Sequence, residues 1–189
     1  MSARTFGTGT KTNTGGLGKY QLDVTASDVA DLVRSAGGWL FDRSMAGWDV
    51  NVVVTGGGDP RPLHILGVDT EPREPDDDAT APARSVALAA SADAVNADPE
   101  LRTDVLRAMK RGVGDVLIWG HSRPEGIERD LDPVEHELSA AARVFKRHAL
   151  AALGLSEPVG PTESFRGRTS LHAAYSDLTP SVATSLAQR

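Results

Sequence analysis

The sequence predicts an α/β fold: a single domain in which a small mixed sheet of about four strands packs against about three helices, with flexible N- and C-terminal arms. Apolar residues recur at helical spacing in three segments, and short apolar or β-branched runs lie between glycines and prolines. The chain has 189 residues, of which 40% are hydrophobic and 24% are charged. This balance is typical of a globular protein.

Composition divides the chain into three parts. Residues 1–21 are rich in Gly, Thr and Lys, so we expect a flexible arm there. Residues 22–154 carry the periodic segments and form the predicted domain, and residues 155–189 are a Ser, Thr and Pro-rich tail. Within the domain, residues 69–84 hold acidic clusters flanked by prolines, which predicts a long exposed loop.

The first ordered element is predicted to be a helix that begins near Thr25 or Ser27. Either residue can cap a helix, and apolar residues then recur at helical spacing: Val29, Leu32, Val33, Ala36 and Leu40. The pair Gly37-Gly38 interrupts this pattern. It indicates either a close packing contact or a break into two shorter helices.

Two strands are predicted next, at residues 48–55 and 63–68. Seven residues join them, which is too few for a parallel crossover. If they are neighbours, they are therefore antiparallel. Residues 85–91 have the length of a strand but the alanines of a helix, and periodicity alone does not decide between the two.

The last part of the predicted domain alternates helix and strand. Asp98-Pro99 opens a helix that Gly112 closes, and residues 115–120 form a buried-type strand. Residues 85–91, this helix and residues 115–120 fit a parallel βαβ crossover. Asp132-Pro133 is expected to start the longest helix, which ends at Gly154.

Charge and cysteine content exclude several classes of function. The chain has no cysteine, so thiol nucleophiles, zinc fingers, iron–sulfur clusters and disulfides are excluded. A formal charge of −6 without a concentrated basic face makes nucleic acid an unlikely partner. We find no apolar run long enough for a membrane helix and no secretory signal, so we expect a cytoplasmic protein that does not contact a membrane.

A candidate ligand site follows the predicted buried strand. Gly120-His121-Ser122-Arg123 leaves its carboxyl end, where open α/β sheets tend to bind ligands. His121 could act as a base, Ser122 as a donor or nucleophile and Arg123 as an anion clamp. The competing interpretation is a surface turn, because neighbouring side chains point in different directions.

A second candidate is the glycine loop after residues 48–55. Consecutive glycines at Gly56, Gly57 and Gly58 would let the backbone approach an anion, with Arg61 as the counter-charge. The competing interpretation is a connector between two strands, since Asp59-Pro60 is ordinary turn chemistry.

Other motifs do not reach a specific pattern. Two glycine-rich stretches in residues 1–20 resemble phosphate-binding loops, but neither follows a strand or has the complete motif. The histidines lack metal-ligand spacing, and Asp76-Asp77-Asp78 lacks the spacing of a calcium loop. We therefore expect no metal and no cofactor.

The aromatic residues around the end of the first helix are interpreted as core. Trp39, Phe41 and Trp48 lie within ten residues, and such a cluster is most simply buried. An exposed Trp39 would instead mark the contact of a possible homodimer. Asp42 and Arg43 are expected to form an exposed pair of little energetic value.

These observations lead to one main functional hypothesis and one alternative. No complete catalytic constellation is recognisable, and the catalytic residues are unknown, while the polar ends and the acidic loop suit contact with a protein partner. The main hypothesis is a binding or regulatory module without its own catalysis. The alternative is an enzyme acting on a small phosphorylated or carboxylated molecule, which requires the carboxyl ends of residues 48–55 and 115–120 to share one edge of the sheet.

Overall fold

The computed structural model describes residues 20–68, 70, 86–112, 114–124, 126–127, 130–168 and 177–181. The predicted arm before Tyr20 and the predicted acidic loop, apart from Thr70, lie outside the described residues.

The described residues confirm the α/β class and the mixed sheet, but they contain seven strands and five helices rather than about four and about three. In chain order these are β1 (Gln21–Ala26), α1 (Val29–Met45), β2 (Asp49–Val54), α2 (Arg61–Ile65), β3 (Val86–Ser91), α3 (Ala92–Ala97), α4 (Pro99–Arg111), β4 (Val116–Trp119), β5 (Asp132–Glu137), α5 (Ala140–Ala152), β6 (Thr162–Arg168) and β7 (Leu178–Pro180).

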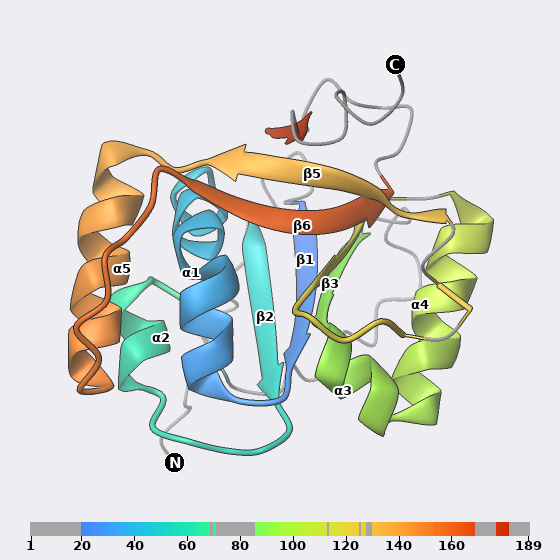
Figure 1. Ribbon diagram of the computed structural model, residues 1–189, viewed down its shortest axis with the longest axis horizontal. Coiled ribbons are helices and arrows are strands. Elements are labelled where there is room, and N and C mark those ends of the chain that lie inside the picture. The colour runs from blue at the N-terminus through green and yellow to red at the C-terminus, as the bar shows by residue number, and fades with distance from the viewer. Residues whose placement is uncertain are drawn as a thin grey trace, which may run out of the picture.

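The strands form one sheet in the order β2-β1-β3-β4-β6-β5-β7. β1 to β4 are mutually parallel, whereas β6 runs antiparallel to both β4 and β5, and β7 runs antiparallel to β5. Figure 1 shows α1, α2 and α5 on one side of the sheet and α3 and α4 on the other. Each side has its own buried apolar cluster, so the protein is built in three layers.

A strand, not a helix, is the first element. In β1 the side chains of Leu22, Val24 and Ala26 are buried, and those between them are partly exposed. This alternation has the period of a strand with one buried and one open face. The helix starts only at Val29, where the side chain of Asp28 accepts a hydrogen bond from the amide of Asp31 at 2.7 Å.

The segment predicted as a strand at residues 63–68 begins inside helix α2. The amides of Leu63 and His64 both donate to the carbonyl of Pro60, which closes a helical turn. The fixed backbone of Pro62 suits this first turn. The expected antiparallel pairing with residues 48–55 therefore does not occur, and β2 pairs in parallel with β1.

The prediction for the middle of the chain is confirmed. Residues 86–91 are the strand β3, α4 begins after the cap Asp98 and ends at Gly112, and β4 follows in parallel with β3. Gly112 has φ of 61°, the left-handed conformation that glycine adopts most easily at a helix end.

The second half of the sheet differs from the prediction. Asp132-Pro133 starts strand β5 rather than a helix, and α5 begins after Ser139, whose hydroxyl accepts from the amide of Ala142. Val134 and His136 of β5 are buried and Glu135 between them is partly exposed, which is the alternation of a strand. β5 pairs with β6. The region predicted as a tail, residues 155–189, thus supplies β6 and β7 to the sheet.

A charged network joins the end of α1 to β5 and to the residue before β7. His136 Nε2 lies 2.9 Å from Asp42 Oδ2, and His136 Nδ1 lies 3.1 Å from Asp177 Oδ2. Arg43 also pairs with Asp177 and holds its guanidinium carbon 4.2 Å from the centroid of the Trp48 ring. Asp42 and Arg43 are therefore members of a partly buried network, not the exposed pair that the sequence predicted.

Trp39 and Phe41 belong to the core, as expected, and Trp48 is partly buried against it. Trp39 is 1% exposed and packs against Phe165 of β6, with 5.3 Å between ring centroids. Because Trp39 is buried, it offers no contact for a second copy of the chain. Among the described residues, no helix combines the length and apolar character that crossing a membrane requires.

The His136 network predicts that stability falls at alkaline pH. Burial alone would lower the pKa of His136, but hydrogen bonds to Asp177 and Asp42 outweigh it and raise this pKa to about 9. The stabilisation is therefore complete below pH 6.5, the ordinary histidine pKa, and disappears as the pH rises through about 9. The shift in the pKa of His136 corresponds to about 3 kcal/mol of unfolding free energy.

Urea unfolding between pH 6 and pH 10 measures this effect. We expect His136→Gln to lose the part of the pH dependence that lies between 6.5 and 9, so the difference in unfolding free energy from the wild type shrinks as pH rises. Parallel curves for the two proteins over this range would contradict the assignment.

Candidate functional site

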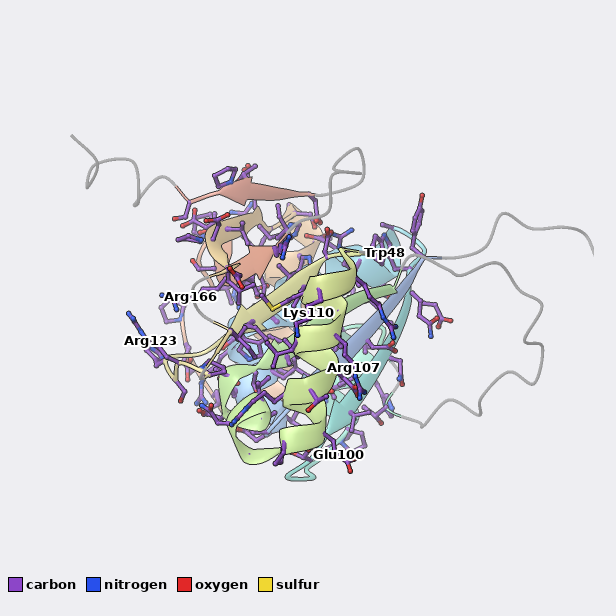
Figure 2. All side chains as sticks on the ribbon, turned by 90° about the vertical axis from the view of Figure 1, so that its right-hand side faces the viewer. Trp48, Glu100, Arg107, Lys110, Arg123 and Arg166 are labelled. Atoms are coloured by element: carbon purple, nitrogen blue, oxygen red, sulfur yellow. The ribbon has the colours of Figure 1, made fainter. Side chains whose placement is uncertain are left out.

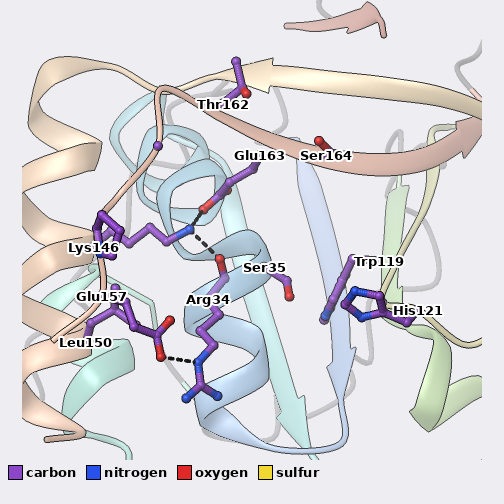
Figure 3. A pocket seen from close by; sticks show the side chains of 13 residues that line it. Arg34, Ser35, Trp119, His121, Lys146, Leu150, Glu157, Thr162, Glu163 and Ser164 are labelled. Atoms are coloured by element: carbon purple, nitrogen blue, oxygen red, sulfur yellow. Dashed lines mark hydrogen bonds and ion pairs between the residues drawn. The ribbon is translucent and has the colours of Figure 1, made fainter. Parts of the chain in front are cut away.

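The candidate site is a pocket at the carboxyl edge of the parallel strands. β1 to β4 end at this edge, and because β6 is antiparallel to β4, its first residues lie there too. The pocket has a volume of about 420 Å³. Its lining comes from α1, β4 and the turn after it, α5, the segment before β6, and β6. It consists of Arg34, Ser35, Trp119, Gly120, His121, Lys146, Leu150, Glu157, Pro158, Gly160, Thr162, Glu163 and Ser164 (Figure 3).

A buried ion pair forms one wall of the pocket. Lys146 Nζ of α5 lies 2.5 Å from Glu163 Oε1 of β6, and the two side chains are 8% and 2% exposed. An unpaired charge in such a place would be strongly unfavourable, so each group depends on the other. Lys146 is thus buried on α5, although its neighbours in sequence, Arg147 and His148, are exposed.

This ion pair forms hydrogen bonds with the backbone in the middle of helix α1. Lys146 Nζ donates to the carbonyl of Arg34 at 2.5 Å, and the amide of Gly38 donates to Glu163 Oε1 at 2.8 Å. Arg34 and Gly38 are four residues apart, the spacing at which an α-helix joins carbonyl and amide directly. The amide of Trp39 donates to Glu163 Oε2, also at 2.8 Å. The pair therefore supplies partners to both sides of one turn of α1. Figure 3 shows the contacts of Lys146 with Glu163 and with the Arg34 carbonyl.

The glycine pair in α1 makes room for this contact. A Cβ atom at Gly38 would lie 2.5 Å from Leu138 Cδ2 and 3.2 Å from Glu163 Oε1. One at Gly37 would lie 3.3 Å from Leu66 Cδ1. Of the two explanations for Gly37-Gly38, the close packing contact is confirmed, and α1 continues through both residues.

Opposing influences act on the carboxyl group of Glu163. Burial raises its pKa, whereas the charge of Lys146 and the amides of Trp39 and Gly38 act in the opposite direction. Burial is the largest of these influences, so the pKa of Glu163 lies above its ordinary value. The donors on both oxygens suit a carboxylate that accepts every hydrogen bond offered to it.

A second set of polar contacts fixes the wall between α1 and β4. Asp31 accepts from Trp119 Nε1 at 2.8 Å and from Ser35 Oγ at 3.1 Å. Both of its oxygens are thereby used to hold pocket residues in place. The amide of Ser27 after β1 donates to the buried hydroxyl of Ser91, at the end of β3, at 3.1 Å. These contacts join the end of β4 to α1, and the end of β1 to the end of β3.

His121 enters the pocket because the chain turns sharply at Gly120. Gly120 follows β4 with φ of 108°, a conformation that glycine adopts without strain. A Cβ atom there would meet Ala92 Cβ at 3.4 Å. His121 is exposed, and Figure 3 shows its ring beside Trp119.

Arg34 lies at the opposite side of the pocket from His121 (Figure 3). Its Nε donates to Glu157 Oε1 at 2.9 Å, and both side chains are 42% exposed. Within the described residues, its two terminal nitrogens have no hydrogen-bond partner. A guanidinium with two adjacent donors in one plane can bind a carboxylate or a phosphate through both.

Only two of the four residues after β4 that were predicted to bind a ligand line the pocket. Gly120 and His121 line it, whereas Ser122 donates a short hydrogen bond to Asp93 and Arg123 projects from the outside of the molecule (Figure 2). The role of all these residues in ligand binding stays a prediction.

The glycine loop lies on the same edge but outside the pocket lining. Its strand, β2, is separated from β4 by β1 and β3, which corresponds to roughly 14 Å at the usual strand spacing. A Cβ atom at Gly56 would lie 2.3 Å from the carbonyl oxygen of Ser27, so packing alone requires this glycine. Arg61 pairs with the neighbouring Asp59 at 2.7 Å. Gly57 and Gly58 both have positive φ.

The described histidines do not come together. His64 is exposed on α2, within the segment that the sequence predicted as a strand. His136 belongs to the network at the far end of α1, His148 is exposed on α5, and His172 lies outside the described residues. Nowhere in the described ranges do three His, Asp or Glu side chains form a group that could hold a metal ion.

Sequence reasoning missed Arg34, Lys146, Glu157 and Glu163. Arg34 and Lys146 lie within helical segments without a motif around them, and both glutamates belong to the region interpreted as a tail. The only signal was Gly37-Gly38, which indicated a close contact with α1 but not its partner.

Comparison with known proteins gives matches among solved structures alone: no family model matches the chain, and no curated protein matches it. One similar structure is a deacetylase–teicoplanin complex from the biosynthesis pathway of teicoplanin, at 13% identity and a TM-score of 0.48, covering 79% of this chain and 99% of that chain. Another is the zinc inhibited form of teicoplanin deacetylase, at 13% identity and a TM-score of 0.47, covering 80% and 99%. At this identity the likeness concerns the backbone fold alone.

The main functional hypothesis is corrected by this finding. A binding or regulatory module that acts through protein contacts, without its own catalysis, was expected, whereas the similar structures reported above are those of a deacetylase. The topological requirement of the alternative is also met, because β2 and β4 are parallel members of one sheet and end at the same edge.

Proposed function

We propose that the protein is an enzyme that acts on a small phosphorylated or carboxylated molecule in the pocket at the carboxyl edge of the sheet. Arg34 binds the anionic group, and His121 transfers a proton. One observation supports this proposal: Arg34 and an exposed histidine, His121, line the same pocket. Within the described residues, the two terminal nitrogens of Arg34 make no hydrogen bond.

The pocket suits a small polar ligand. Its volume of about 420 Å³ falls in the lower part of the range of roughly 300 to 1,000 Å³ that ligand pockets occupy. Serine and threonine hydroxyls from Ser35, Thr162 and Ser164 line it beside the charged groups. Such hydroxyls can orient a ligand by donating or accepting hydrogen bonds.

The roles of Arg34 and His121 follow from their chemistry. A guanidinium stays charged across the physiological pH range and binds planar anions with two parallel hydrogen bonds. An imidazole is the side chain best able to accept and return a proton near neutral pH. Trp119, held by Asp31, supports the strand end from which His121 leaves.

The anion-binding role predicts that Arg34→Ala weakens the binding of small anions. Isothermal titration with inorganic phosphate and, separately, with succinate should show saturable binding to the wild type. Loss of charge-assisted hydrogen bonds should raise the dissociation constant about tenfold or more. Arg147→Ala is the matched control, because Arg147 is exposed on α5 and does not line the pocket. Equal binding by wild type and Arg34→Ala would remove this role.

The catalytic role predicts that His121→Ala slows turnover. With the p-nitrophenyl esters of phosphate and of succinate as probes, we expect the wild type to hydrolyse at least one, and kcat to fall about a hundredfold or more in the variant. His148→Ala, on the exposed face of α5, should behave as the wild type. The role is rejected by a His121→Ala protein that keeps its kcat, or by a wild type inactive on both esters.

A further inference from the structure

The charges that line the pocket are already balanced by one another. The lining contains two cations, Arg34 and Lys146, and two carboxylates, Glu157 and Glu163. Lys146 pairs with Glu163 at 2.5 Å, and Arg34 pairs with Glu157 at 2.9 Å. An anionic ligand that approaches Arg34 therefore meets a carboxylate at the same guanidinium.

The two pairs differ in how easily they can be exchanged. Glu163 is buried and also accepts from the amides of Gly38 and Trp39, so its place is fixed by the fold. Glu157 is 42% exposed and contacts Arg34 through a single nitrogen. An ion pair at such exposure contributes little to stability, so a competing anion can replace it.

The backbone around Glu157 is anchored, which leaves the side chain as the part that can move. Before it, the amide of Leu155 donates to the carbonyl of Leu150 at 3.0 Å. After it, the carbonyl of Pro161 accepts from the amide of Leu138 at 2.8 Å. A rotation of the Glu157 side chain is sufficient to release Arg34, without movement of the segment between α5 and β6.

We propose that Glu157 is an internal counter-ion of Arg34 that an anionic ligand displaces, and thus an autoinhibitory contact that sets the affinity of the pocket. This inference rests on the proposed anion-binding function. The carboxylate of Glu157 occupies one donor of the guanidinium and repels a second anion. Its removal therefore strengthens binding of a phosphate or carboxylate group.

The test is the affinity of Glu157→Gln for inorganic phosphate, with succinate in a second arm to distinguish the two kinds of anion. Titration calorimetry should give a dissociation constant about threefold to tenfold below that of the wild type. The gain should shrink in high salt, because screening weakens the repulsion that the variant removes. Glu100→Gln on α4 makes the same change in net charge outside the pocket and should bind as the wild type does.

The outcomes separate this inference from the proposed function. If the wild type binds and Glu157→Gln binds equally or more weakly, the counter-ion role is overturned while anion binding stands. An equal gain in Glu100→Gln also overturns it, because net charge then accounts for the effect. If neither the wild type nor Glu157→Gln binds either anion, both the inference and the proposed function fail.

Discussion

The arrangement of the pocket depends on one buried ion pair, Lys146 with Glu163. It joins α5 to β6, and it supplies a donor to the Arg34 carbonyl and an acceptor to the Gly38 amide in α1. A buried ion pair adds little net stability compared with apolar residues of similar volume. Separating the two partners is nevertheless strongly unfavourable, because it leaves a buried charge without compensation. α1 is thereby held in one position relative to α5 and β6, which follow it more than ninety residues later in the chain.

This constraint brings charged groups of different character to the same pocket. The buried pair is part of the scaffold, whereas Arg34, whose carbonyl accepts from Lys146, extends its side chain to an exposed partner, Glu157. His121 reaches the pocket independently, through the turn at Gly120 after β4. The site therefore combines a rigid wall with side chains that can exchange partners, which is the combination that ligand binding needs.

The parts of the fold that local signals encode could be predicted from the sequence. Caps at Asp98 and Gly112 located α4 correctly, and the buried run at residues 115–120 located β4. Predictions failed where tertiary pairing overrides local signals. Asp132-Pro133 resembles a helix start, yet pairing with β6 makes this segment a strand. Because β6 was hidden in a Ser and Thr-rich region, its partner was missed as well.

Only those residues of the candidate site that directly follow a strand could be predicted from the sequence. Gly120 and His121 directly follow a recognisable strand and line the pocket. Lys146 and Glu163 are 17 positions apart on α5 and β6, and they meet on the backbone of α1; no sequence motif predicts this pair. Gly37-Gly38 indicated that something packs closely on α1, but a carboxylate from a later strand leaves no local signal.

A double-mutant cycle on the free energy of unfolding tests the central interaction most directly. Lys146→Met should lower the free energy of unfolding by about 3 to 5 kcal/mol, because it leaves Glu163 buried without its cation. The double variant Lys146→Met/Glu163→Gln should recover a substantial part of this loss, since it removes both charges. A single variant that loses less than about 1 kcal/mol, or a double variant whose loss equals the sum of the two singles, would contradict the account.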